Sequence, residues 1–292
     1  MRTLVVTAAN EALAPLLRGL IESIGQWEPR PFTDLACFDL GLAPGTLEWV
    51  RRHASHVVAP GWDLPVADKL RAERPELRAL TVRPFLPKYF PAYDAYLWID
   101  ADAWVQERFA LEWFFAEAAE GALVAAPQVD RAYRHTSGHV GNRINRAVAY
   151  FGQAAGSRAV CNTYFDSGVF ALRSDAPHWA RWAGWFHAGL TTAKGELCCD
   201  QTAFNHALWT ERLPVRPLPA LCNWLCHLAL PGFDPTRGRF CEPFVPRNPI
   251  GILHLTGRTK DGAFELPADG SVPGVSLRYP GAPAMPPTGP EN

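Results

Sequence analysis

The chain has 292 residues, of which 48% are hydrophobic and 20% are charged, a composition typical of a globular protein that can bury a large core. Its 28 basic and 29 acidic side chains give a formal net charge of -1, which argues against a general nucleic-acid binder. A small molecule is therefore the more natural ligand.

The predicted elements alternate between short apolar strands and amphipathic helices. This alternation predicts an α/β fold with a mostly parallel central sheet and helices on both faces. The predicted strands cover residues 2–8, 35–42, 56–60, 95–100, 122–127 and 165–173, and the predicted helices cover 13–24, 46–53, 108–121, 177–190 and 200–209.

Two segments lack clear periodicity. Residues 130–146 are polar and basic, and they are interpreted either as a solvated loop or as a flap over an acceptor. The last 30 residues hold seven prolines and four glycines. We therefore predict one domain over residues 1–262 and a flexible Pro/Gly-rich tail over 263–292.

Neither a signal peptide nor a membrane span is evident, so a cytoplasmic protein is expected, with peripheral membrane contact left open. The seven cysteines are an odd number and do not resemble a disulfide framework. Cys222 and Cys226 lie four residues apart, which is a weak metal-binding pattern without a second pair. We expect them to be structural thiols.

The strand predicted at 95–100 runs directly into two carboxylates, Asp100 and Asp102. Alternate residues of an extended segment share a face, so both carboxylates can converge on one cation. The carboxyl ends of parallel strands are also where open α/β sheets bind ligands. A divalent ion held by two carboxylates keeps coordination positions for phosphate oxygens. The pair predicts a metal-diphosphate site, and a strand-end turn with solvated carboxylates is the alternative.

Later stretches add polar groups of the same kind. "FDSGVFAL" places Asp166, Ser167 and Gly168 at the start of an apolar strand. "DQTAFN" begins a predicted helix with Asp200 as its expected N-cap and Gln201 beside it. "HLTGRTK" carries His254, Gly257 and Lys260, and a flexible loop with a lysine is suited to binding phosphate.

In their order along the chain, these motifs resemble those of the retaining glycosyltransferases of family eight, which include glycogenin and the lipopolysaccharide galactosyltransferases and have the GT-A fold. The resemblance covers roughly residues 1–262. The matching stretches are "DAD", "FDSGV", "DQTAFN", "LPALCNWL" and "HLTGRTK".

The resemblance implies a nucleotide-diphospho-sugar donor, most commonly a UDP-sugar, and transfer of a hexose to a carbohydrate or glycoconjugate acceptor with retention of configuration. The implied metal is Mn²⁺, with Mg²⁺ as the alternative, held by Asp100, Asp102 and His254. Gly257 and Lys260 would hold the diphosphate, Arg83 would act on the phosphate side, and Asp200 and Gln201 would face the anomeric carbon.

Further donor contacts implied by the resemblance are Thr7, Ala8, Asn10, Ala101, Asp166 and Ser167. The stretch after the first strand, "TAANEALA", lacks the tyrosine that is common in the family, and Asp166 stands where the family commonly has asparagine. Both departures bear on which base and which sugar are bound.

Two other functions stay open. A nucleotide-sugar-binding protein or inactive homologue would keep the fold without transferase activity. A nucleotidyltransferase would also have a carboxylate-metal site, but it should carry a Gly-rich basic loop after the first strand, which "TAANEALA" does not provide. Most of the tryptophans, including Trp179, Trp182 and Trp185, are predicted to be packing residues.

Overall fold

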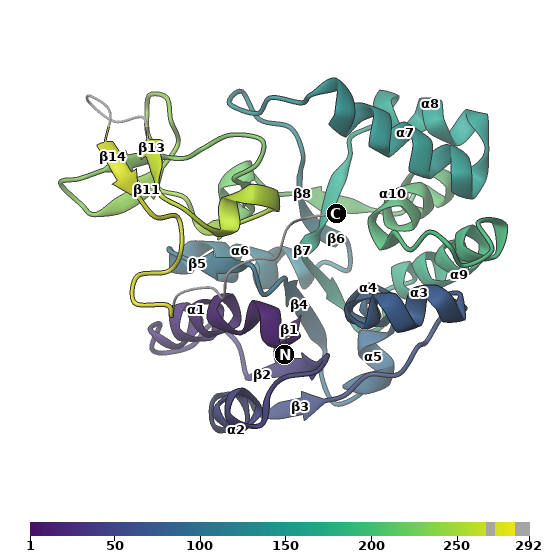
Figure 1. Ribbon diagram of the computed structural model, residues 1–292, viewed down its shortest axis with the longest axis horizontal. Helices are drawn as coiled ribbons and strands as arrows, with labels where there is room; N and C mark the ends of the chain where they lie inside the picture. The colour runs from purple at the N-terminus through teal and green to yellow at the C-terminus, as the bar shows by residue number, and fades with distance from the viewer. Residues whose placement is uncertain (267–271, 284–292) are drawn as a thin grey trace.

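A seven-stranded mixed sheet forms the centre of the molecule in the computed structural model, which describes residues 1–266 and 272–283 (Figure 1). Four of its neighbouring pairs are parallel, and one strand, β7, runs antiparallel to both of its neighbours. The predicted, mostly parallel α/β sheet is confirmed. The strand order is β3 (His56–Val58), β2 (Asp34–Asp39), β1 (Thr3–Ala9), β4 (Ala95–Ile99), β7 (Phe165–Arg173), β6 (Leu123–Pro127) and β8 (Val215–Pro217).

Helices cover both faces of this sheet, because the buried strands present apolar side chains on each side. In β1, for example, Leu4 and Val6 belong to one core and Val5 and Ala9 to the other. The second core is closed by α1 (Ala14–Gly25), α2 (Pro44–His53) and α6 (Arg108–Ala118). On the opposite side lie α3 (Asp68–Glu73), α4 (Arg78–Val82), α5 (Leu86–Tyr89), α7 (Ser137–Phe151), α8 (Gln153–Cys161), α9 (His178–Thr192) and α10 (Asp200–Glu211).

A small sheet lies beside the end of β4. In it β12 (Ile252–His254) is the central strand, antiparallel to β5 (Ala103–Val105) and parallel to β9 (Trp224–Leu225). The remaining elements are the hairpins β10 (Gly232–Asp234) with β11 (Arg239–Cys241) and β13 (Phe264–Leu266) with β14 (Val272–Val275), and the 3-10 helices η1 (Glu11–Leu13), η2 (Pro75–Leu77), η3 (Arg83–Phe85), η4 (Ala220–Cys222) and η5 (Gly257–Lys260).

The direction of β7 decides where the polar residues meet. Because β7 is antiparallel to β4, with Ile99 opposite Val169, the start of β7 lies at the same edge as the end of β4. The Asp100 N–H donates to the Gly168 carbonyl at 2.8 Å. Residues far apart in the chain therefore converge at one edge of the sheet.

The loop predicted over residues 130–146 is only partly correct. From Ser137 the chain is helical, and Thr136 caps this helix by accepting a hydrogen bond from the His139 N–H at 3.2 Å. The helix α7 has a narrow apolar stripe that buries Ala147 and Tyr150, while Arg143 donates to Gln128 Oε1 and Arg146 to Cys199 Sγ. That stripe lies mostly beyond residue 146, so the basic half of the helix resembles a loop in sequence.

Two further expectations concern helix α10 and the tail. Asp200 is the first residue of α10 and not its N-cap, because Cys199 holds that position. In the described part of the tail, Leu266 and Leu277 are fully buried, and Trp104 Nε1 donates to the Leu277 carbonyl at 2.8 Å. This part of the tail therefore packs on the domain. Residues 267–271 and 284–292 lie outside the described residues.

The aromatic and sulfur-containing side chains are mainly packing groups. Trp179 and Trp182 are buried in the core under α9, as predicted. All seven cysteines are free thiols, and Cys222 and Cys226 are buried. Within the described ranges, no helix is long and apolar enough to cross a membrane.

Candidate functional site

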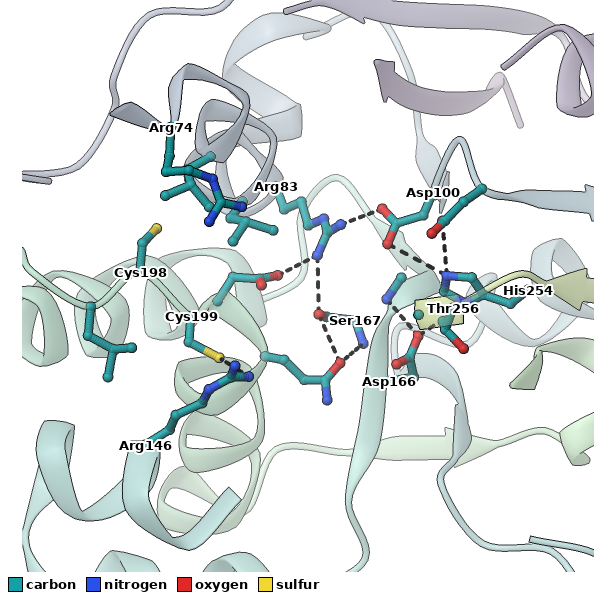
Figure 2. Close-up of a pocket in the computed structure, with 18 of the residues that line it drawn as sticks. Arg74, Arg83, Asp100, Arg146, Asp166, Ser167, Cys198, Cys199, His254 and Thr256 are labelled. Carbon is teal, nitrogen blue, oxygen red and sulfur yellow. Dashed lines mark hydrogen bonds and ion pairs between the residues drawn. The ribbon is translucent and has the colours of Figure 1, made fainter. Parts of the chain in front are cut away.

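A cavity of about 520 Å³ opens at the sheet edge where β4 ends and β7 begins (Figure 2). Most of the sequence-predicted residues line it, so the motifs lie together in space. Those lining it are Arg83, Asp100, Asp102, Asp166, Ser167, Asp200, Gln201, His254 and Gly257.

Arg83 lies at the centre of one side of the cavity. One of its terminal nitrogens donates to Asp200 Oδ2 at 2.7 Å and to Ser167 Oγ at 3.2 Å, and the other donates to Asp100 Oδ1 (Figure 2). The guanidinium also lies 4.9 Å from the centre of the Trp98 ring. Burial lowers the pKa of Arg83, but Asp100 and Asp200 more than offset this, so the group stays charged. The buried guanidinium of Arg83 thus links the end of β4, the start of β7 and the start of α10.

Asp100, Asp102 and His254 form a cluster on the other side. One potential ligand atom from each lies within 4.8 Å of the other two. His254 Nε2 is 3.2 Å from Asp102 Oδ1 and 3.9 Å from Asp100 Oδ2. Two carboxylate oxygens and an imidazole nitrogen are a donor set that suits Mn²⁺ and other divalent ions. The residues present therefore fit a divalent metal.

The charges of this cluster are strongly perturbed. Burial lowers the pKa of His254, but Asp102, and after it Asp166 and Asp100, raises it to about 9. Burial also acts on Asp102, but His254 and Lys260 hold its pKa below the usual range, whereas burial raises the pKa of Asp100. Without a metal, His254 therefore carries the positive charge that the two carboxylates require.

Two glycines shape the cluster. A Cβ atom at Gly168 would lie 2.4 Å from His254 Cε1 and 2.6 Å from Asp100 Oδ2, so only glycine leaves both side chains in place. Gly257 has φ of 61°, the left-handed region that glycine adopts without strain. It starts η5, from which Lys260 Nζ reaches Asp102 Oδ2 at 3.0 Å. Lys260 is thereby placed beside the cluster.

Gln201 is held against the start of β7. Its Oε1 accepts hydrogen bonds from the Ser167 N–H at 3.1 Å and from Ser167 Oγ at 3.4 Å. One turn later in α10, Asn205 is fully buried and exchanges hydrogen bonds with the backbone of Phe165. The first turns of α10 and the start of β7 are therefore fixed to each other.

A second cavity of about 350 Å³ adjoins the first and shares Arg83, Asp100 and Asp102 with it. Ala8, Asn10 and Ala101 line it, together with the apolar side chains Leu13, Leu40, Leu77 and Leu80. Thr7 is fully buried inside β1, and its hydroxyl has no hydrogen-bond partner within the described structure. The predicted residues after β1 are thus split between a cavity wall and the core.

Sequence reasoning gave no role to several residues that contact the cluster. Trp98 Nε1 donates to Asp100 Oδ1 at 2.7 Å, and Asn223 lies between His254 and Asp166. Gln128 and Arg143 extend the same network. Asn223 belongs to the "LPALCNWL" stretch, so the motif could be identified from the sequence, but the contacts of Asn223 with His254 and Asp166 could not.

No protein-family model and no curated protein sequence matches this chain. Solved structures do resemble it. The galactosyltransferase LgtC in complex with donor and acceptor sugar analogues is 15% identical, with a TM-score of 0.53 over 88% of each chain, and an active-site mutant of LgtC gives 0.52 over 87% of each. Mouse xyloside xylosyltransferase 1 in its apo form is 12% identical, with a TM-score of 0.52 over 88% of this chain and 98% of the other.

These identities are low, and the likeness establishes the fold. The chain has the GT-A fold seen in these glycosyltransferases, with its central sheet and covering helices in the same arrangement.

Proposed function

We propose that the chain is a metal-dependent glycosyltransferase that moves a hexose from a nucleotide-diphospho-sugar, with a UDP-sugar as the expected donor, to an acceptor hydroxyl with retention of configuration. The observation that carries the proposal is the Asp100–Asp102–His254 cluster at the ligand-binding edge of a GT-A sheet, with Lys260 beside it. The fold alone would not assign an activity.

The two adjoining cavities suit the two ends of such a donor. The smaller, apolar cavity would take the base and ribose, with contacts from Ala8, Asn10 and Ala101. The larger cavity would take the diphosphate and the sugar, since its wall carries cationic and hydrogen-bonding groups. Gly257 and Lys260 would hold the diphosphate, and Asp166 and Ser167 would face the sugar.

Asp100, Asp102 and His254 would hold Mn²⁺, or alternatively Mg²⁺, at the junction of the cavities. When bound, such an ion supplies positive charge to the diphosphate. Lys260 would add to it, because its ammonium lies next to the cluster and can reach a phosphate oxygen. Arg83 would hold Asp100 and Asp200 in place through its buried ion pairs.

The transfer requires a bond from the acceptor oxygen to the anomeric carbon, while the bond from that carbon to the phosphate oxygen breaks. The acceptor proton passes to the departing phosphate oxygen on the same face, so no separate protein base is needed. Gln201 and Asp200 line the cavity where they can orient the sugar and its anomeric carbon. A carbohydrate or glycoconjugate would approach from the open side of the same cavity.

The alternative functions are less well supported. A nucleotidyltransferase needs a Gly-rich basic loop after β1, whereas η1 follows there, and its Glu11 carboxylate accepts from the Ala43 N–H and the Thr46 hydroxyl. A nucleotide-sugar-binding protein without activity would keep the cavities, and only an assay separates it from an enzyme.

The test is donor binding by Asp102→Ala. We expect this variant to fold but to lose manganese-dependent binding of UDP-sugars in isothermal titration. Asp175→Ala is the control, because Asp175 pairs with Arg173 at an exposed site. Undiminished manganese-dependent binding by Asp102→Ala would contradict the site assignment.

A further inference from the structure

The asparagine of the "LPALCNWL" stretch has no part in the proposed function, yet it is one of the most buried polar side chains in the chain. Asn223 is 1% exposed and lies between η4 and β9. Its Oδ1 is 3.0 Å from His254 Nδ1, and its Nδ2 donates to Asp166 Oδ1 at 3.1 Å. The side-chain amide of a buried asparagine has one accepting end, the oxygen, and one donating end, the NH₂ group. Its orientation therefore decides which neighbour must donate a hydrogen bond and which must accept one.

The Asp166 carboxylate fixes that orientation. Its two oxygens are surrounded by donors, since Oδ1 also accepts from the Gly168 N–H at 2.9 Å and Oδ2 accepts from Gln128 Nε2 at 3.1 Å. A carboxylate accepts hydrogen bonds and cannot donate them, so the NH₂ group of Asn223 must face Asp166. The Asn223 carbonyl oxygen must then face His254.

The far end of the network points the same way. An arginine can only donate, and an Arg143 terminal nitrogen donates to Gln128 Oε1 at 2.6 Å. The NH₂ group of Gln128 is therefore the end that faces Asp166. With a pure donor at one end and a pure acceptor in the middle, the hydrogen bonds run in one direction from Arg143 through Gln128 to Asp166.

His254 completes the argument. Because Asn223 offers it a carbonyl oxygen, the Nδ1 atom of His254 must carry a proton. Its other nitrogen, Nε2, is the atom that faces Asp102 and Asp100. When Nε2 gives up its proton, the imidazole is left in the single tautomer whose free lone pair points at the two carboxylates.

We propose that Asn223 is a positioning residue that fixes the tautomer and ring orientation of His254, and that Asp166, whose Oδ1 also lies 3.6 Å from His254 Nδ1, holds Asn223 in the required orientation. This inference rests on the metal site of the proposed function. It also gives a physical reason for a carboxylate at position 166. An asparagine there could present a hydrogen-bond donor to Asn223, and it would set its own NH₂ group against that of Gln128 in one of its two orientations.

The experiment measures binding of Mn²⁺ alone, from the electron paramagnetic resonance signal of the free ion, to the wild-type chain, Asn223→Ala and Asn205→Ala. Partners of a metal-ligating histidine typically contribute about 10–100-fold in metal affinity. We expect a loss of that size in Asn223→Ala. Asn205→Ala is the matched control, because Asn205 is an equally buried asparagine that ties Phe165 to α10 without touching His254.

A second measurement needs no variant of Asn223. In the Mg²⁺-saturated wild-type chain labelled with ¹⁵N-histidine, the His254 signals, identified by their absence in His254→Gln, should show a protonated Nδ1 and an unprotonated Nε2. A protonated Nδ1 agrees with a carbonyl oxygen of Asn223 facing His254, whereas an unprotonated Nδ1 would show that the NH₂ group of Asn223 faces it instead. It also serves as the test if Asn223→Ala does not fold.

The outcomes are distinct. Binding of Mn²⁺ by Asn223→Ala within twofold of the wild type, or a protonated Nε2 in the Mg²⁺-saturated chain, would overturn the positioning role and leave the proposed function standing. Absence of Mn²⁺ binding in the wild type would contradict the metal site itself. A loss of affinity confined to Asn223→Ala, with the expected ¹⁵N pattern, would support the inference.

Discussion

Replacing Arg83 by methionine tests how the charges of the cavity are balanced in the metal-free chain. Arg83 and Asp200 are 5% and 4% exposed at their side chains, so their ion pair is almost fully withdrawn from water. Removing one partner of a buried pair leaves the other charge uncompensated, which costs about 3–5 kcal/mol. We expect Arg83→Met to lower the free energy of unfolding by that amount in urea, at pH 7 with chelator present.

The pH dependence and a control sharpen this prediction. The loss of unfolding free energy should be smaller at pH 4 than at pH 7, because burial raises the pKa of Asp100 and a larger share of that carboxyl is protonated at the lower pH. Arg78→Met is the control, since among the described residues Arg78 donates to backbone carbonyls alone, at 3.0 to 3.2 Å. The stability that Arg78→Met loses should therefore not depend on pH. A loss below about 1 kcal/mol for Arg83→Met, or one equal at both pH values, would refute the reasoning.

Three other predictions follow from the same geometry. Gln201→Ala should lower turnover more than donor affinity in steady-state kinetics, and equal turnover in variant and wild type would remove Gln201 from the mechanism. Gly168→Ala should weaken Mn²⁺ binding measured by titration, because the new Cβ would overlap His254 and Asp100, and unchanged affinity would contradict that crowding. In chelator, the raised pKa of His254, about 9 against about 6.5 in an unfolded chain, should stabilise the fold fully below pH 6.5 and progressively less as pH rises through 9. Urea unfolding of the wild type should show this decline and His254→Asn should not, and equal slopes would argue against the ion pair.

The sequence predicted the fold well, because its apolar residues are arranged in recognisable patterns. The strands β1 and β4 follow from short continuous apolar runs, and α1 follows from apolar residues at helical spacing. The direction of β7 could not be predicted in this way, since an apolar strand looks the same in either direction. That direction is what brings Asp166 to the edge where Asp100 lies.

Site residues that belong to a single sequence motif could be predicted. Contacts between residues of two different motifs could not. Asp100, Asp102 and His254 could be proposed from their spacing and from the family resemblance, and the structure brings them together. The contact between Asn223 and Asp166 joins residues 57 positions apart, and no local pattern encodes it. Thr7 was expected to contact the donor from the family resemblance, but it lies within β1 and its side chain is fully buried.

The most direct test of the proposed function is a thermal-shift measurement with UDP, GDP and CMP, each with Mn²⁺ and with chelator. A nucleotide at about 100-fold excess over its dissociation constant should stabilise the native chain by about 2.7 kcal/mol. We predict a shift that requires Mn²⁺ and is largest with UDP. No shift with any of the nucleotides, or equal shifts with Mn²⁺ and with chelator, would contradict a metal-dependent nucleotide-sugar site.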